Sequence, residues 1–436
     1  MLNVFKNKNF SFLFLGRLVS NAGDSLYAVA AMWLVYELGG SAFYTGLAGF
    51  LTLLPQSLQF LAGPFVDRWS LKWTLVVSQL IEFILIIIIP IFHFLDLLNV
   101  AVVLTVMPLA TLVNQIAYPA QSAALPKILS KDELVKGNSA FSFAYQGVDL
   151  TFNALAGILV AAVGAVSLYI IDSITFLAAA LLFLSLNIPQ KKKQQKSKQK
   201  RPIKETMKAY VGEIKEGVSF IRGSLIEKIV FGSVVANFAI GATIAVLPVL
   251  GDTLGGSHIY GYYLAALSAG SLLGALTASW VEKFPLGKFA IISFLFGSCF
   301  WFVSSIVPWT AVSIALFGMA WIPIGMTNVI FAALMQSVVP DHLLGRVFSV
   351  LMSVNTVAMP VGSLIGGTMT ELIGSQLVFG CTALGIAVVP IYWLFFNKDL
   401  RGLPIVKEID AAYVGLEQFD TSQIDKDTSS KVNSLA

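Results

Sequence analysis

The sequence predicts an all-α membrane protein with twelve transmembrane helices arranged as two six-helix pseudo-repeats. Three observations predict it: the composition, the spacing of the basic residues, and the similarity of the two halves. Of the 436 residues, 57% are hydrophobic and only 12% are charged, and the mean hydropathy is +0.81. Soluble domains carry about 25% charged residues. Apolar runs of about 20 residues, the length that crosses a bilayer, follow one another along the chain, which excludes a water-soluble fold.

Lysine and arginine divide the chain into hairpins. They leave six stretches without a positive charge, at 18–67, 73–126, 137–190, 229–282, 289–345 and 347–397. Each stretch is long enough for two spans of about 20 residues and a short turn. Turn-forming residues lie near the middle of each stretch, at 39–41, 96–99, 163–164, 251–257, 307–308 and 374–375. Six hairpins give twelve spans.

Basic residues concentrate in cytoplasmic loops of membrane proteins. The pattern therefore predicts that both termini are cytoplasmic and that the hairpin turns face outward. It predicts a multi-pass protein of the bacterial plasma membrane. The net charge of +4 reflects this topology, and we expect no nucleic-acid partner.

The chain divides into two similar halves. We expect an N-terminal six-helix bundle over 1–190, a cytoplasmic linker with an amphipathic helix over 191–222, a C-terminal bundle over 223–397, and a polar, disordered tail over 398–436. The motif LGGS at 38–41 recurs at 254–257, an offset of 216 residues. Two parallel six-helix repeats are the architecture of secondary transporters that rock about a central site.

The sequence contains none of the motifs of ATP-driven or hydrolytic chemistry. It has no GxxxxGK[ST] phosphate loop, no nucleophile elbow and no HExxH metal motif. We therefore expect a carrier and not an enzyme, without cofactor or metal, driven by a proton gradient or by the gradient of its substrate.

The segment GPFVDRWSLK at 63–72, together with GRLVSNAGDSLYAVAAMWLVYE in the first span, resembles the major facilitator superfamily and its macrolide-efflux branch of drug:proton antiporters. The resemblance covers about residues 1–400. It implies a cytoplasmic latch between the two halves, formed here by Gly63, Asp67, Arg68 and Lys72. The second copy of this loop lacks the Asp-Arg pair, and the antiporter signature usual in the fifth span is absent, so the resemblance implies proton antiport less directly than transport.

Charged residues at membrane depth are costly and are functional candidates by default. Arg17, Asn21 and Asp24 share one face of the first span, and Asp149 lies in the fifth. We expect Arg17 to pair with Asp149 and Asp24 to exchange a proton, because burial disfavours an ionised carboxylate and a nearby cation favours it. The proton-coupling residues would thus be Asp24, Asp149 and Arg17. The alternative is that these residues form a static network of polar contacts that holds the helices together.

Two further acids, Glu82 in the third span and Asp172 in the sixth, are interpreted as structural supports, because the resemblance makes these spans peripheral. The resemblance also implies that spans one, four, seven and ten line the cavity. With the polar stripe of span five, the expected cavity residues are Asn21, Asn114, Tyr118, Gln121, Gln146, Asn153, Asn237, Trp321 and Asn328.

Together these features predict a monomeric secondary exporter of a hydrophobic, drug-like or macrolide-like compound, working by proton antiport and capable of conferring drug resistance. One alternative keeps the fold and moves a lysophospholipid, a siderophore or another metabolite. Another is a membrane receptor or scaffold that no longer transports.

Overall fold

The computed structural model describes residues 2–57, 70–188, 221–281, 283–339, 341–410 and 413–415, with isolated positions 212 and 218–219. All regular secondary structure in these residues is helical. Nine of the described helices are long and apolar enough to cross a membrane. The chain is therefore an all-helical, multi-pass membrane protein. Most of the linker expected at 191–222, including its amphipathic helix, lies outside the described residues.

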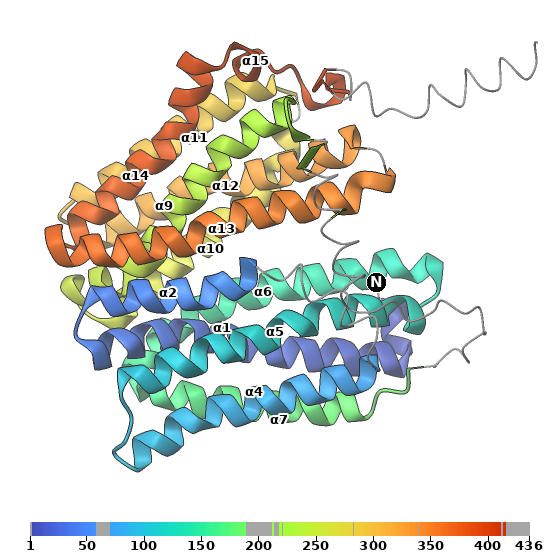
Figure 1. Ribbon diagram of the computed structural model, residues 1–436, viewed down its shortest axis with the longest axis vertical. Helices are drawn as coiled ribbons and strands as arrows, with labels where there is room; N and C mark the ends of the chain where they lie inside the picture. The colour runs from blue at the N-terminus through green and yellow to red at the C-terminus, as the bar shows by residue number, and fades with distance from the viewer. Residues whose placement is uncertain are drawn as a thin grey trace, which may run out of the picture.

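The helices form two groups in chain order (Figure 1). After a short 3₁₀ helix, η1 (Leu2–Lys6), the N-terminal group comprises α1 (Lys8–Gly39), α2 (Ala42–Ser57), α4 (Leu71–Phe94), α5 (Val100–Ile128), α6 (Lys131–Val163) and α7 (Ala165–Leu184). The C-terminal group comprises α9 (Leu225–Leu254), α10 (Ser257–Val281), α11 (Leu286–Ile306), α12 (Thr310–Val338), α13 (Asp341–Ile373) and α14 (Ser375–Ile391). A π-helical turn, η3 (Tyr392–Phe396), continues α14.

The helices break where the turn signals predicted. Gly40 ends α1 in the left-handed conformation at φ 63°, which a glycine adopts without steric cost. Gly164 separates α6 from α7, and Gly374 separates α13 from α14. We call the end of the molecule that carries these turns the hairpin end, and the opposite end, where η1 lies, the linker end (Figure 1).

The two groups meet at the hairpin end, where α2 packs on α13 and α6 packs on α10. Glycines allow the helices to touch through their backbones. A Cβ atom added to Gly157 of α6 would lie 2.2 Å from the Cα atom of Gly261 in α10, and one added to Gly46 of α2 would lie 2.9 Å from the Cα atom of Gly367 in α13. The hairpin end is therefore closed.

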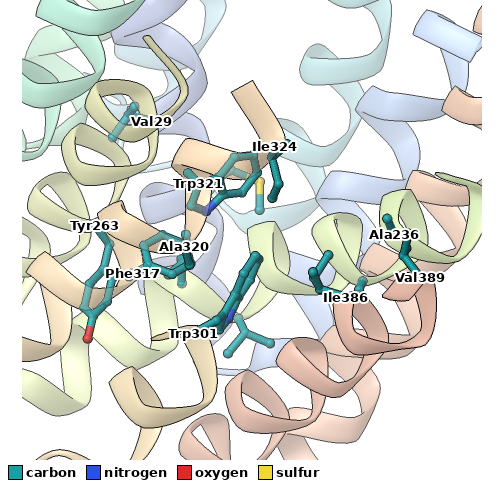
Figure 2. Close-up of a cluster of buried hydrophobic side chains, with 14 of the residues drawn as sticks. Val29, Ala236, Tyr263, Trp301, Phe317, Ala320, Trp321, Ile324, Ile386 and Val389 are labelled. Atoms are coloured by element: carbon teal, nitrogen blue, oxygen red, sulfur yellow. The ribbon is translucent and has the colours of Figure 1, made fainter. Parts of the chain in front are cut away.

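The interior of the C-terminal group is an aromatic cluster (Figure 2). Trp301 packs edge-on against Phe317 with ring centroids 4.9 Å apart, and Trp321 lies 5.7 Å from Trp301. Tyr263 adds a further edge contact to Phe317 and places its hydroxyl 2.6 Å from that of Ser313.

Part of the segment predicted to be disordered is folded. Residues 398–410 form α15 (Lys398–Arg401) and a 3₁₀ turn, η4 (Val406–Glu408). Leu400 and Leu403 are buried, and the carbonyl groups of Leu403 and Pro404 accept hydrogen bonds from the first amides of α11. The apolar side chains of this segment pack it against the bundle, and its carbonyl groups satisfy the free amides at the start of α11. The overall composition of the tail is polar and did not indicate this packing.

Candidate functional site

A cavity of about 510 Å³ lies between the two groups, on the linker side of their contacts. Its size suits a drug-sized molecule. Ten polar side chains line it: Asn21, Asp24, Ser25, Thr52, Gln56, Glu82, Thr111, Asn114, Gln115 and Asp149. All ten belong to the N-terminal group. The C-terminal group contributes an apolar wall of Ile244, Tyr260, Leu264 and Leu267.

Asp24 lies on the cavity face of α1. The side-chain amide of Asn114 on α5 donates to both of its carboxylate oxygens, at 3.1 and 3.0 Å. Asp24, predicted as a proton-coupling residue, and Asn114, predicted as a cavity residue, thus meet across neighbouring helices on the cavity wall.

Arg17 is buried two helical turns closer to the linker end, with 4% of its surface exposed. Its guanidinium donates to Gln121 Oε1 at 3.1 Å, to the Tyr145 hydroxyl at 3.2 Å and to Ser20 Oγ at 3.3 Å. The Tyr145 hydroxyl also donates to Gln121. Arg17 is thus held by neutral partners on α5 and α6, while its charge interacts with those of Asp24 and Glu82.

The predicted pair of Arg17 with Asp149 does not form. The Asp149 carboxylate accepts instead from the Ser25 hydroxyl at 3.0 Å and from the Asn21 amide at 3.5 Å, and it faces the cavity. The depth of the two residues could be counted along their spans, but the direction in which each helix turns its side chain could not. Lys228 and Asp399, which form an ion pair at 2.6 Å, lie outside the cavity lining.

The two acids interpreted as structural supports lie close to the site. Glu82 on α4 lines the cavity and is 1% exposed, so its position is not peripheral. Asp172 on α7 is fully buried and packs against α1, where a Cβ atom added to Gly23 would lie 2.1 Å from Asp172 Oδ1. Asp24, Glu82 and Asp172 interact electrostatically with one another.

Several predicted cavity residues lie elsewhere. Tyr118 is 53% exposed, and Gln121 is buried as a partner of Arg17. Asn237 donates to the Ser233 carbonyl of its own helix. Asn328 is exposed on α12 but does not belong to the cavity lining, and Trp321 is buried in the aromatic cluster. Span four lines the cavity through Thr111, Asn114 and Gln115, whereas span ten contributes no residue to the described lining, because α12 packs against α10 and α11.

Other predicted residues cannot be located in the site. The side chains of Gln146 and Asn153, and all of Gly63, Asp67 and Arg68, lie outside the described residues. Lys72 is half-buried in the first turn of α4. The latch thus stays a prediction.

The cavity lining also includes residues that were not predicted from the sequence, among them Thr52, Gln56, Thr111, Gln115 and Tyr260. Thr111 and Gln115 lie within a turn of Asn114 and could have been found by extending its helical face. Gln56 and Thr52 lie on α2, which the resemblance did not place at the cavity.

Two polar contacts close the hairpin end. The Glu371 carboxylate of α13 accepts from the Ser41 hydroxyl at 2.6 Å and from the backbone amides of Ala42 and Phe43, at the start of α2. The Tyr36 hydroxyl donates to Asp252 Oδ2 at 2.9 Å. A carboxylate at a helix N-terminus is favoured by the free amides and the helix dipole. Each contact joins one group to the other.

Comparison with known proteins supports the assignment of the fold. The fold is similar to that of the nucleoside transporter NupG, with a TM-score of 0.66 at 13% identity over 89% of this chain and 99% of that one. It is equally similar to a bacterial homologue of the human lysosomal transporter Spinster in an inward-facing conformation, with a TM-score of 0.66 at 13% identity over 89% and 96% of the two chains. At these identities the likeness shows the fold alone, which is the helical bundle of these two transporters.

The sequence comparisons identify the family. The model of the transmembrane secretion effector family, which belongs to the major facilitator superfamily (MFS), matches residues 1–426. The chain therefore belongs to that family and is a transporter and not an enzyme. It is 23% identical to the uncharacterized MFS-type transporter YvqJ of Bacillus subtilis, over 93% of this chain and 96% of that one. It is 23% identical to the multidrug efflux pump Tap of Mycolicibacterium fortuitum (91% and 95%) and to the staphyloferrin A transporter of Staphylococcus aureus (89% and 94%).

Proposed function

We propose that the protein is a secondary active exporter of a hydrophobic, drug-like or macrolide-like compound that it exchanges for protons. The observation that carries this proposal is the cavity, in which the carboxyl groups of Asp24, Glu82 and Asp149 face an apolar wall from the C-terminal group. Carboxyl groups can bind and release protons, and apolar walls suit a lipophilic solute. The similarity to the multidrug efflux pump Tap supports export.

The proposal includes the topology. Twelve spans form two bundles over 1–190 and 223–397, with the termini and the linker in the cytoplasm of a bacterial cell. The carrier is a monomer in the plasma membrane, has no cofactor and does not bind nucleic acid. With the linker end in the cytoplasm, the structure corresponds to the inward-facing state of alternating access. The predicted cytoplasmic latch of Asp67 and Arg68 would then close the linker end in the outward-facing state.

Export is tested by measuring accumulation of a labelled macrolide in cells with and without the protein, before and after adding a protonophore. We expect the protein to lower accumulation and the protonophore to restore it. Asp24→Asn should abolish the difference, because the amide cannot carry a proton. Asp399→Asn is the matched control, since it removes a surface ion pair of small energetic value and leaves the cavity unchanged.

Equal accumulation in all cells would overturn the macrolide assignment and direct the test to lysophospholipids and other metabolites. Export that the protonophore does not affect would overturn proton coupling. If Asp24→Asn has no effect and no flux is measured for any probe, transport would be overturned in favour of a membrane receptor or scaffold.

A siderophore is the second candidate cargo, favoured by the similarity to the staphyloferrin A transporter. The described lining contains no Lys or Arg, and its three carboxyl groups would repel an anionic chelator. We therefore rank it below a neutral or cationic lipophilic compound. Uptake or efflux of a labelled siderophore in the same cells distinguishes the two.

A further inference from the structure

We propose that Glu82 and Asp172 form a second proton-binding site behind Asp24, so that the coupling machinery extends from α1 into α4 and α7. This inference rests on the proposed proton antiport. It assigns to two residues, interpreted from the sequence as structural supports, a part in the transport cycle. Glu82 is the carboxyl that exchanges its proton with the cavity, and Asp172 is the positioning residue behind it.

Burial makes the two carboxyl groups unusual. Glu82 is 1% exposed and Asp172 is 0% exposed, although both lie in the middle of helices in the N-terminal group. Glu82 still reaches the cavity wall beside Asp24, so protons can reach it from there. Asp172 does not line the cavity and is separated from it by α1, against which it packs at Gly23.

Neither carboxyl group is fully hydrogen-bonded. Glu82 Oε2 accepts from the side-chain amide of Gln79, and Asp172 Oδ1 accepts from the Thr175 hydroxyl at 3.1 Å. The second oxygen of each, Glu82 Oε1 and Asp172 Oδ2, has no partner among the described residues. An ionised carboxylate buried with an unpaired oxygen is strongly disfavoured, whereas a protonated carboxyl is neutral and can itself donate.

Two buried tyrosines also point to an exchangeable proton at this place. Tyr27 on α1 and Tyr169 on α7 pack edge-to-face at 5.4 Å, and both hydroxyls lack a hydrogen-bond partner in the described chain. Tyr27 lines the cavity and interacts electrostatically with both Glu82 and Asp172. Its unpaired hydroxyl is the group that we assign to connect the cavity side with the buried side, through a hydrogen bond that forms when the hydroxyl turns toward a carboxyl group.

The charge balance favours the same conclusion. Three carboxyl groups, Asp24, Glu82 and Asp172, form a cluster of mutually interacting acids with one interacting cation in the described chain, Arg17. A fourth acid, Asp149, interacts with Asp24 from the cavity wall and is counted outside this cluster. The other titratable groups facing Glu82 and Asp172 are Tyr27 from α1 and Tyr169 from α7, both neutral as phenols, while α5 presents the neutral Asn114. Neutralising the cluster requires two protons in addition to Arg17. Asp24 can carry one of them, and Glu82 with Asp172 holds the other.

The first test uses infrared spectroscopy of the purified full-length protein and needs no transported ligand. The wild type should show absorption from protonated carboxyl groups at neutral pH. Glu82→Gln should remove part of that absorption, and Asp172→Asn should remove part or shift it, while Asp24→Asn should leave these components in place. Asp399→Asn, at the surface, should change nothing.

The second test measures protons moved per labelled macrolide in proteoliposomes. Glu82→Gln should lower this ratio by about one half, because one of two coupled protons is lost. Tyr27→Phe should keep the ratio and slow proton exchange, since only the connecting hydroxyl is removed.

A wild-type spectrum without protonated carboxyl absorption would overturn the inference even if a variant failed to fold. So would a Glu82→Gln protein with an unchanged spectrum and an unchanged proton ratio. The failure of the proposed function is distinguishable, because wild-type export that does not respond to a protonophore refutes antiport whatever the infrared spectrum shows.

Discussion

The interiors of the two helix groups are built from different chemistry. The N-terminal group buries Arg17, Glu82 and Asp172 and places Asp24 at the edge of the cavity. Among the buried residues described in the C-terminal group there is no Asp, Glu, Lys or Arg, and the centre is the aromatic cluster around Trp301 (Figure 2). The N-terminal group thus has charged side chains in its interior, whereas the described interior of the C-terminal group is uncharged and mainly apolar.

The offset of 216 residues between the two LGGS motifs allows the charged positions of the first half to be compared with their counterparts in the second. At 216 residues, Arg17 falls on Ser233, Asp24 on Ile240 and Glu82 on Ser298. Each of these three charged residues thus corresponds to a neutral residue in the second copy. Because buried charges are costly, their restriction to one copy favours an N-terminal group that holds the coupling residues of the proposed exchange and a C-terminal group that supplies a surface for closure.

The largest expected effect comes from removing the single cation of the polar interior. Arg17→Gln leaves Asp24 and Glu82 without an opposing charge and removes the guanidinium that donates to Gln121 and Tyr145. Breaking a buried charge arrangement in this way costs about 3–5 kcal/mol. We expect loss of export by more than tenfold and a lower unfolding temperature, measured in the accumulation assay and by thermal denaturation in detergent.

Arg222→Gln is the control for that change, because Arg222 is exposed outside the cavity. It should retain wild-type export and stability. Equal behaviour of the two variants would show that the polar interior does not depend on Arg17 and would remove the contrast between the groups.

The sequence predicted the fold more completely than the site, for a physical reason. Hydrophobic length and turn residues are local, so helix breaks such as those at Gly40, Gly164 and Gly374 could be located without knowledge of packing. A functional pair depends on the rotation of each helix about its axis. Arg17 and Asp149 have similar depth, yet they contact different neighbours.

The same limit explains the other differences. Trp321 lies on a span expected to face the cavity, but it packs into the aromatic cluster. Glu82 lies on a span expected to be peripheral, but it reaches the cavity. The charge of Glu82 in an apolar run was the signal that could have identified it, since an acid at membrane depth marks function regardless of which helix carries it.

If the C-terminal group closes the hairpin end by packing against the N-terminal group, a change in the glycine contact between them should open that end. A methyl group added by Gly157→Ala would collide with the backbone of α10 at Gly261. Overpacking of this kind costs about 1–3 kcal/mol, which corresponds to a population shift of roughly tenfold away from the closed hairpin end. Spin labels at positions 38 and 372, in a variant with Cys299 and Cys381 replaced by serine, should report longer distances.

The matched control is Gly147→Ala in the same helix. A Cβ atom added at Gly147 meets nothing within 4 Å, so the variant should keep the wild-type distance distribution. If both variants give the same distances, the glycine contact does not determine closure.

A smaller effect is expected from the polar contact at the same end. Glu371→Gln keeps an oxygen that can accept from Ser41 but removes the negative charge at the start of α2. The charge at a helix N-terminus is worth about 1 kcal/mol, so the closed population should fall by roughly fivefold. The same spin-label pair measures it. Glu37→Gln, an exposed acid near the same turn, should have no effect, and a comparable shift there would attribute the result to general surface charge.

The smallest effect on transport is expected in the aromatic cluster. Trp301→Phe keeps an aromatic ring against Phe317 and removes an indole nitrogen that has no hydrogen-bond partner among the described residues. The loss of volume should lower stability by about 1 kcal/mol and leave export within about twofold of the wild type, since no group that can hold a proton is touched. Thermal denaturation and the accumulation assay measure the two quantities separately. A loss of export much larger than the loss of stability would mean that the C-terminal interior takes part in coupling, because packing alone changes both in proportion.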